Sequence, residues 1–580
     1  MEPKTRKTNS PSLTIPFFFF NIYKLHYKFR CQTIKTSIYL HILPVTFNKL
    51  DCCVHRKGHQ TRQVSSTSAP RSSTSPQRRN VAAPAVASKV KPFTDIPGPL
   101  ALPMLRHSVH VLPRIGNFHH TVGLGLLEGL RNRYGDIVRL AKASRKRPVL
   151  YLFDPELMRQ VYDSNLTEIP YWEKSPLKQQ RENSGHSHLQ SGETKAVFAG
   201  LKTLLQDGVL LKSFEKVFDE ISAEATRRLG DLRFAENALN EEVETEMYRW
   251  ALEIMGVMLF GIRLGALNGP THEPTDDNRY RPNPGFESDA CSLFKRSPGD
   301  LSAAEQLVRC TKEIAEGSYM VRSEQTLKSE SQTFNQALKA IDRHFSITEH
   351  FLKQALEQLN TENRKPEQIL IERLQPLQDR ILPLAADLLL AGIEPLVHST
   401  ISMFYHLALN AARQQQAHDQ VCWAAACTHA GAGTPQLTYL RACATEALRL
   451  HPVTGGVVRR SKESLEISGY EVPAGVDIVL AHGVASKCDK QWGRGKAFIP
   501  DRWSSQSWEP LKASRAHPLA TLPFGQSCPA SGIIENILAT LATRVLEKYR
   551  IEWHGPAPNM ATTGINKLQR PYYFVLQNAA

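Results

Sequence analysis

The sequence lacks a regular cysteine pattern. Its ten cysteines form no C-x-x-C pair and no evenly spaced series, which excludes the disulfide framework of a small secreted domain. Cys52, Cys53, His55 and His59 lie close together, but their spacing fits no zinc-binding pattern, so we interpret them as incidental. This cysteine usage favours free thiols in an intracellular compartment.

Acidic residues are nearly absent from the first 94 residues. This stretch has sixteen Lys or Arg against Glu2 and Asp51, and so carries +14 of the net charge of +15. The remainder is close to neutral, which excludes a basic nucleic-acid-binding surface, and we expect no nucleic-acid partner. The acid-poor, Ser- and Thr-rich composition is typical of a mitochondrial transit segment or, alternatively, of a disordered basic tail. We predict a leader over residues 1–92 and one folded domain over residues 93–580.

No apolar run near the start is long enough to cross a bilayer. The patch FFFFNIY (17–23) falls short of the ~20 residues that a membrane-spanning helix needs. The longer apolar segment 381–410 is interrupted by Asp387, Glu394 and His398, which predicts a buried core helix. We therefore expect peripheral contact with a membrane and no spanning anchor.

Strand-like segments and internal repeats are also scarce in the body of the chain. Helical periodicity dominates residues 120–260 and 302–360, whereas strand patterns are confined to 147–154 and to a cluster around 465–485. Residues 268–300 are dense in Pro, Gly, Asn and Asp, which predicts a long exposed insertion. We predict a mainly α-helical domain with small β-sheets.

One cysteine lies between a turn and a long helix in TLPFGQSCPASGIIENILATLATRVLEKY (521–549). Pro and Gly in LPFG indicate the turn, and an apolar stripe with spacings of three and four indicates the helix: Ile534, Ile537, Leu538, Leu541 and Val545. Cys528 then lies near the helix N-terminus, with Pro529 in the first turn, where free N–H groups favour a thiolate. Such a thiolate can ligate haem iron; a buried, unreactive cysteine is the alternative.

Two further segments carry a predicted charge cluster. In TEALRLHP (445–452), Glu446 and Arg449 are three residues apart and share one face of a helix. In AFIPDRW (497–503), Arg502 can bind the same carboxylate through its planar guanidinium. The alternative is a solvated surface pair, which is the usual role of E-x-x-R on a helix.

In chain order, these motifs resemble the cytochrome P450 haem-thiolate monooxygenases: AGIE in the long apolar helix, EALR, FIPDRW, and PFG followed by a cysteine. The resemblance covers roughly residues 93–578. DIPGP after the leader, RYGDIVRL, LVRCTKEI, EALRLHPVTGG and SGYEVPAG resemble the mitochondrial class, and most of all the arthropod ecdysteroid hydroxylases of the moulting-hormone pathway.

The resemblance implies a mainly α fold with small β-sheets, haem b as cofactor and a steroid-like lipophilic substrate. It further implies dioxygen as oxidant and electrons from an adrenodoxin-type ferredoxin and its NADPH-dependent reductase. The implied location is the matrix side of the mitochondrial inner membrane, with the endoplasmic reticulum as the alternative.

The resemblance also implies which residues contact the cofactor. Cys528 corresponds to the axial thiolate ligand of the haem iron, and Phe524 and Gly525 correspond to the loop that precedes it. Arg459 corresponds to a position that pairs with a haem propionate, which suits the two-pronged donor geometry of arginine. Residues 453–458 would border the substrate.

Other corresponding positions concern oxygen activation, stability and partner binding. Those over the oxygen-binding face are Ala391, Gly392 and Glu394. Those of the buried cluster that braces the haem-binding core are Glu446, Arg449 and Arg502. Arg441 corresponds to a basic residue for ferredoxin docking, whereas Thr445 replaces a second one.

The sequence departs from the family pattern at three places. The loop from Phe524 to Cys528 spans four residues where the family has seven, which removes up to about 10 Å of reach together with a Gly and an Arg. Pro395 replaces a threonine that helps deliver protons, and Lys195 and Ala199 replace a Trp and an Arg. These departures leave two hypotheses: a monooxygenase, whose short loop reflects a misplaced exon junction, and a non-catalytic ligand-binding or interaction protein of the same fold.

Overall fold

The computed structural model describes residues 90–100, 123–140, 147–168, 176–186, 191–233, 238–239, 242–268, 302–321, 332–359, 368–429, 437–525, 528–563 and 565–579. The predicted leader and the Cys52–His59 group lie outside the described residues, except for residues 90–92 at the end of the leader. The predicted insertion at 268–300 also lies outside them, except for Asn268.

The described part of the chain is mainly α-helical, which confirms the predicted fold class. Its helices are α2 (Gly123–Tyr134), α3 (Pro155–Asp163), α4 (Pro176–Asn183), α5 (Ser191–Leu204), α6 (Gly208–Asp231), α7 (Val243–Phe260), α8 (Ala303–Val321), α9 (Gln332–Leu359), α10 (Ile369–Leu374), α11 (Ile381–Leu409), α12 (Ala411–His429), α13 (Thr438–Leu450), α14 (His482–Ala485) and α15 (Ser531–Lys548).

Small β-sheets accompany the helices. Strands β1 (Ile137–Leu140), β2 (Val149–Leu152), β7 (Asp477–Leu480), β4 (Val457–Ser461) and β3 (Thr167–Glu168) form one sheet in that order. Three two-stranded sheets pair β5 (Leu465–Ile467) with β6 (Tyr470–Val472), β8 (Tyr549–Trp553) with β11 (Phe574–Asn578), and β9 (Met560–Thr563) with β10 (Ile565–Leu568). The sequence predicted the strands near 147–154 and 465–485 but not the two C-terminal pairs.

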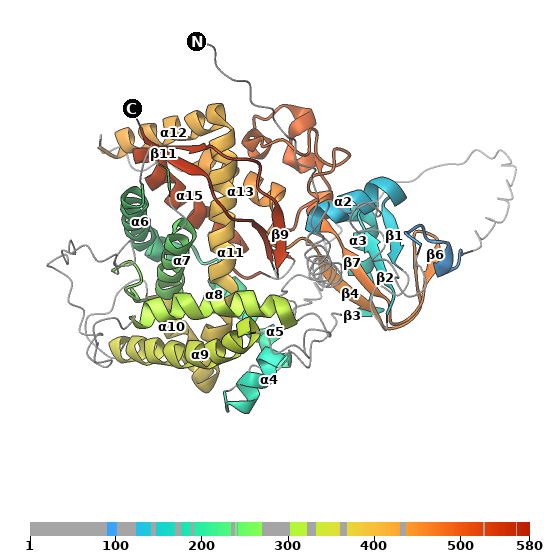
Figure 1. Cartoon of the computed structure of the whole chain (residues 1–580), viewed down its shortest axis with the longest axis horizontal. Coiled ribbons are helices and arrows are strands. Elements are labelled where there is room, and N and C mark those ends of the chain that lie inside the picture. Colours follow the sequence, from blue (N-terminus) through green and yellow to red (C-terminus); the bar gives the residue numbers. More distant parts are fainter. Residues whose placement is uncertain are drawn as a thin grey trace, which may run out of the picture.

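The five-stranded sheet and the helices form two adjoining parts of the molecule. In Figure 1 the sheet lies to one side with α2 and α3, while the longer helices gather around α11. Strand β2 pairs parallel with β7, and its side chains are buried on both faces of the sheet. Leu150 and Leu152 join one apolar cluster and Tyr151 joins another, as a strand covered on both faces requires.

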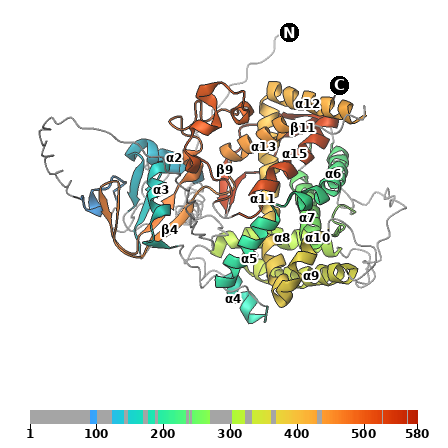
Figure 2. The same cartoon turned by 180° about the vertical axis from the view of Figure 1, so that it is seen from behind.

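Helix α11 runs through the centre of the helical part. Figures 1 and 2 show it extending between α12 at one end and α9 at the other. It packs against α7, α13, α9 and strand β8, and most of its residues are buried. Pro395 lies inside this helix without ending it, although proline has no N–H to donate to the carbonyl of Ala391. The expected buried core helix at 381–410 is therefore present.

The same helix accounts for the single membrane-span candidate in the described part of the chain. Leu377–Leu409 is long and apolar enough to cross a bilayer, but 67% of the candidate window is buried inside the protein. Its apolar surface packs against neighbouring helices, as in the core helix of a globular domain.

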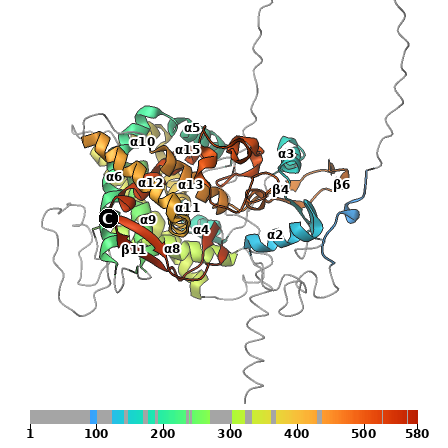
Figure 3. The ribbon, with the colours of Figure 1, turned by 90° about the horizontal axis from the view of Figure 1, so that it is seen from above.

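The helix after Cys528 begins later than its sequence indicates. Helix α15 starts at Ser531, so Pro529 lies before the helix and not in its first turn as predicted. The apolar stripe packs against α6, α13 and α12. Figure 3, seen from above, shows α15 and α13 close together, with the chain's C-terminus near α12.

A buried glutamine joins α12 to the edge of strand β8. Nε2 of Gln414 donates to the carbonyls of Ile551 (2.8 Å) and Leu407 (3.0 Å), and its Oε1 accepts from the N–H of Ile551 (2.7 Å). The side chain is 4% exposed. It thus supplies a two-stranded sheet with the hydrogen bonds that a third strand would otherwise provide.

We predict that Gln414→Leu lowers the free energy of unfolding by about 2–4 kcal/mol, because the buried N–H and C=O of Ile551 lose their hydrogen-bond partner. The matched control is Gln415→Leu, since Gln415 is exposed and bonds only the nearby Asp419. Denaturant midpoints of the two variants and the wild type measure the effect. Equal midpoints for both variants would contradict this role of Gln414.

Candidate functional site

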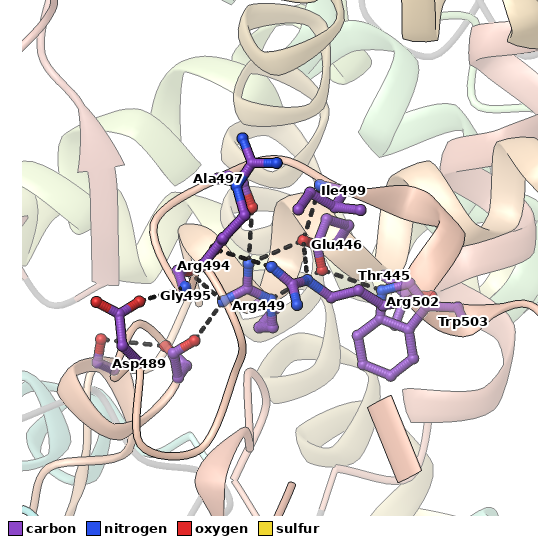
Figure 4. Close-up of polar contacts among 12 residues, drawn as sticks. Thr445, Glu446, Arg449, Asp489, Arg494, Gly495, Ala497, Ile499, Arg502 and Trp503 are labelled. Carbon is purple, nitrogen blue, oxygen red and sulfur yellow. Dashed lines mark hydrogen bonds and ion pairs between the residues drawn. The ribbon is translucent and has the colours of Figure 1, made fainter. Parts of the chain in front are cut away.

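A buried carboxylate binds two arginines at the end of α13. Arg449 donates from Nε to Oε2 of Glu446 and from Nη2 to Oε1, both at 2.8 Å. Arg502 donates from Nε to Oε1 at 3.0 Å. The N–H of Ile499 (3.0 Å) and Nε1 of Trp503 (3.1 Å) complete the set of donors. The three charged side chains are fully buried, and Figure 4 shows them converging.

The outer face of this cluster holds a long loop in place. Arg449 also donates to the carbonyls of Gly495 (2.7 Å), Ala497 (3.1 Å) and Ser486. Nη2 of Arg502 donates to the carbonyl of Arg494 at 2.8 Å. Backbone carbonyls therefore accept hydrogen bonds from guanidinium N–H groups that do not contact Glu446. A buried ion cluster is stable only with such additional hydrogen bonds. The structure places this predicted set together in the core and not on the surface.

Cys528 lies in the wall of an apolar cavity of about 150 Å³. Phe524 and Gly525 also line this cavity, and α11 contributes Ala391, Gly392, Glu394 and Pro395 to the lining. The remaining lining is largely aliphatic and includes Leu205, Met255, Met258, Val453, Ile537 and Ile565. Segments far apart in the sequence thus bring six predicted site residues to one cavity.

The surroundings of Cys528 act on its thiol in two directions. Burial raises the pKa of the thiol, because desolvation disfavours the thiolate. The backbone N–H groups of Ala530 and Ser531, just before and at the start of α15, and the charge of Lys202 oppose this by lowering the pKa. These N–H groups point at the sulfur as they would at an anion. Lys202 belongs to α5 and was not predicted from the sequence.

The segment that leads to Cys528 is held by hydrogen bonds over residues 519–525. The N–H of Gly525 donates to the carbonyl of Leu522 (3.1 Å), and φ of +70° at Gly525 permits this tight turn. The N–H of Thr454 donates to the carbonyl of Pro523 at 3.0 Å. Earlier in the loop, the carbonyl of Leu519 is 2.7 Å from Nδ1 of the buried His482.

His482 joins this loop to the sheet part of the molecule. Its Nε2 lies 2.8 Å from the hydroxyl of Tyr162 in α3, while Nδ1 bonds Leu519. Burial lowers the pKa of His482 to about 4, although the bond to the Leu519 carbonyl works in the opposite direction. The imidazole is therefore neutral at neutral pH.

A second buried polar cluster extends from the cavity along α11. Glu394 lines the cavity and lies 3.3 Å from Nζ of Lys567. Nε2 of His398, one turn further along α11, is 3.9 Å from Glu394 and 3.8 Å from Glu244. Glu244 in turn lies 3.0 Å from Nε of Arg570, a side chain that is 50% exposed. Burial, reinforced by the nearby cations Lys567 and Arg570, lowers the pKa of His398 well below its ordinary value.

Other predicted positions are not brought to the cavity. Arg459 is buried in β4 with its guanidinium over the ring of Tyr162, 5.5 Å from the centroid, and it does not line the cavity. Ala199 in α5 is exposed, and the side chain of Lys195 lies outside the described part. Of residues 453–458, only Val453 and Thr454 are lining residues.

Sequence reasoning missed the partners of Glu394. The spacing of four between Glu394 and His398 was a usable signal, because it places both on one helix face. Glu244 and Lys567 come from distant elements, and nothing in their local sequence indicates that they meet α11. Only the tertiary structure shows this cluster.

The cavity residues fit a haem group on its thiolate side. A soft sulfur ligand with backbone N–H donors lines an apolar space, and small residues of α11 belong to the same lining. Gly392 also allows close packing of α7, since a Cβ there would lie 2.5 Å from Cε of Met255. Cys528 would hold the iron, and the aliphatic side chains would enclose the porphyrin.

We predict that Glu446→Gln lowers the free energy of unfolding by about 3–5 kcal/mol, because it leaves two buried guanidinium groups without a countercharge. The control is Asp477→Asn, which breaks a half-buried pair with Arg460 (2.7 Å) and should cost about 1 kcal/mol or less. Denaturant unfolding of both variants provides the comparison. A similar cost for both would show that burial of the cluster contributes nothing extra.

We predict that His482 contributes to acid sensitivity. Its pKa of about 4 in the folded protein lies below the ordinary value of about 6.5, so the unfolded chain binds a proton first and stability falls as the pH drops from 6.5 towards 4. His482→Gln should reduce this loss by roughly 3 kcal/mol, because glutamine does not titrate but still offers a donor for the Leu519 carbonyl and an acceptor for the Tyr162 hydroxyl.

Unfolding free energies of the wild type and His482→Gln at pH 7, 5.5 and 4.5 measure this contribution. His554→Gln, which changes an exposed ring, is the control. Parallel pH profiles for the wild type and His482→Gln would contradict the prediction.

Comparison with known proteins agrees with this geometry. A family model described as "Cytochrome P450" matches residues 106–576. "Cytochrome P450 302a1, mitochondrial" of Drosophila melanogaster is 26% identical over 506 residues, covering 83% of this chain and 94% of the relative. "Cytochrome P450 12b1, mitochondrial" of Drosophila acanthoptera is 24% identical over 494 residues, covering 81% and 87%. "Probable cytochrome P450 49a1" of Drosophila melanogaster is 24% identical over 499 residues, covering 81% and 80%.

The family and the mitochondrial class that the motifs resemble are thus confirmed, as is the helical fold. The match of the family model spans most of the chain and includes both Cys528 and the Glu446 cluster. The chain belongs to the cytochrome P450 family, whose members are haem-dependent monooxygenases.

Proposed function

We propose that this protein is a mitochondrial monooxygenase that hydroxylates a steroid-like lipophilic substrate, with an ecdysteroid precursor as the preferred candidate. The observation that carries this proposal is the apolar cavity between Cys528 and α11. Among its lining residues only Glu394 carries a formal charge. The chemistry of this lining favours an apolar ligand with few polar groups.

The aliphatic walls would bind and orient the substrate. Side chains from α5, α7, α11 and α15 line the cavity, so four helices fix its shape. Burial of apolar surface is worth about 25 cal/mol per Å², which would provide most of the affinity for an apolar substrate. The same walls exclude water from the reaction.

The thiol of Cys528 would lose its proton and serve as the ligand on one side of the cavity. The N–H groups of Ala530 and Ser531 would stabilise the sulfur's negative charge. When bound, haem supplies the one-electron and dioxygen chemistry, which inserts one oxygen atom into a C–H bond and releases the other as water. This balance consumes two electrons and two protons per turnover.

Glu394 lines the cavity, and its carboxylate would hold a proton there. Lys567 lies 3.3 Å from Oε1 of Glu394 and is 22% exposed, which connects the carboxylate with the protein surface. Pro395 has no hydroxyl, and the nearby Thr400 donates its hydroxyl to the carbonyl of Leu396. His398, whose Nε2 lies 3.9 Å from Glu394, is the next titratable side chain along α11.

The class of relatives supports a proposal for the electron donor and the location. Several of them are named as mitochondrial, and the leader of this chain has a composition typical of a transit segment. This supports a ferredoxin and its NADPH-dependent reductase as the source of electrons at the matrix side of the inner membrane. Arg441 in the first turn of α13 is the candidate contact for an acidic ferredoxin.

We predict that the reduced protein with carbon monoxide shows the shifted Soret band of thiolate-ligated haem, and that Cys528→Ala abolishes it while leaving the fold intact. The measurement is a difference spectrum, with circular dichroism to verify folding. Cys443→Ala is the control, because Cys443 is also buried but lies outside the cavity lining. A folded wild type that binds no haem would contradict the monooxygenase proposal and would favour the hypothesis of a non-catalytic binding protein.

The substrate class is tested separately from haem binding. The loaded protein is incubated with ecdysteroid precursors, a mitochondrial ferredoxin, its reductase and NADPH, and mass spectrometry follows the gain of one oxygen atom. Omission of the ferredoxin should abolish the product. Turnover of fatty acids but not sterols would overturn the proposed substrate while leaving the reaction type in place.

A further inference from the structure

A second cavity, of about 640 Å³, opens on the protein surface away from Cys528. It lies where the end of α11, the start of α12, the end of α13 and the loop around residues 494–499 meet. Its lining residues are Tyr405, His406, Leu409, Asn410, Arg413, His451, Arg494, Lys496, Ala497, Phe498, Ile499 and Leu511. We call it the α12 cleft. Its volume suits a small organic ligand, and it shares no lining residue with the Cys528 cavity.

Three cations converge on the α12 cleft, and its lining includes no Asp or Glu. Arg413 pairs with Asp501 (2.5 Å), and Lys496 pairs with Glu128 (3.0 Å), but neither acid is a lining residue. Arg494 makes no ion pair among the described residues. The cleft therefore presents positive charge towards its interior, with one arginine uncommitted.

The position of Arg494 is imposed by the buried cluster. Its φ is +56°, which is unusual for a residue with a side chain. Its carbonyl accepts from Arg502, and the next residue's N–H donates to Asp489 at 2.6 Å. In Figure 4 its guanidinium points away from the Glu446 cluster. The fold thus holds a strained backbone that directs a cation out of the cluster, a feature that recurs at functional sites.

The floor of the α12 cleft contains a buried polar atom without a partner. His406 is 9% exposed, and its Nε2 has no hydrogen-bond partner in the described structure. Its ring stacks on Phe498, with 5.0 Å between centroids and 3° between planes. Burial, and then the nearby charges of Lys487 and Arg449, lower the pKa of His406 to about 3. The imidazole of His406 is therefore neutral, lies among positive charges, and has one ring nitrogen without a hydrogen bond.

Helix α12 contributes its positive end to the cleft, where the negative ends of α11 and α13 oppose it, so the preference for anions rests mainly on the side-chain cations. It has 19 residues and begins at Ala411, so its first N–H groups lie beside Asn410 and Arg413 in the lining. The free N–H groups and positive end of a helix favour phosphate. Together with the three cations, these N–H groups favour an anionic group on the ligand.

We propose that the α12 cleft binds a small organic phosphate monoester with a planar apolar body. The phosphate would contact Arg494, Lys496 and the start of α12, and the apolar body would lie against Leu409, Leu511 and the edge of the aromatic floor. The proposal does not depend on haem or on hydroxylation, because the cleft and the Cys528 cavity are separate.

The test is calorimetric titration of the full chain with 1-naphthyl phosphate at pH 7.5 and low salt. We expect saturable binding that weakens when the salt concentration is raised. Arg494→Gln should weaken it about tenfold or more, as expected for the loss of a charged hydrogen-bond donor. Lys496→Gln, at a side chain that is 71% exposed, gives a second reading if Arg494→Gln does not fold.

The matched protein control is Arg515→Gln, which removes an exposed cation from the same loop but outside the cleft. It should leave the affinity unchanged. The matched ligand is neutral 1-naphthol, which should bind at least tenfold more weakly than the phosphate. Equal affinities of the two ligands, an equal loss in Arg515→Gln, or no saturable binding of 1-naphthyl phosphate would overturn the proposal. Haem content is measured on the same sample. The monooxygenase proposal is thus tested separately from binding of 1-naphthyl phosphate.

Discussion

The carboxylate of Glu446 is the constraint on which the rest of this structure depends. A fully buried charge is stable only if every lone pair is matched, and here two guanidinium groups, one amide N–H and one indole N–H meet it. The donors come from α13 and from the loop that ends near Trp503. The cluster therefore fixes that loop, from which the chain continues through Leu519 towards Cys528. The same geometry directs Arg494 into the α12 cleft.

Helix α11 connects the two cavities through a buried polar stripe. Glu394, His398, Ser402 and His406 recur at a spacing of four, so they follow one slowly turning line along the helix. The first lines the Cys528 cavity, and the last lines the α12 cleft. Between them, Ser402 lies 3.0 Å from Nδ1 of His451, which also lines the cleft. Ligands in the two cavities would thus contact opposite ends of the same stripe.

Most features that depend on residues close together in the chain could be predicted from the sequence. Helical periodicity, the buried helix at 381–410 and the pairing of Glu446 with Arg449 all depend on residues that are close in the chain. The motifs also predicted that Cys528, Phe524 and the Ala391–Glu394 segment belong to one site. The partners of Glu394 and the α12 cleft were beyond reach, because they depend on contacts over long sequence separations. The start of α15 was missed because Pro529 is equally acceptable before a helix and in its first turn.

The short loop before Cys528 has a physical consequence for cofactor retention. The loop still brings Cys528 to the cavity, because Pro523 is held by Thr454 and the helix after it begins only at Ser531. It omits, however, the arginine that the family pattern places there, and Arg459 lies against Tyr162 instead of lining the cavity. The cations that would pair with propionates are thus absent from the described lining. Retention of haem would therefore rest on the thiolate and the aliphatic walls, with Lys202 of α5 as the cation that acts on Cys528. Since apolar contacts are insensitive to salt whereas exposed ion pairs are screened, the walls formed by α7, α11 and α15 would set how firmly this chain holds its cofactor.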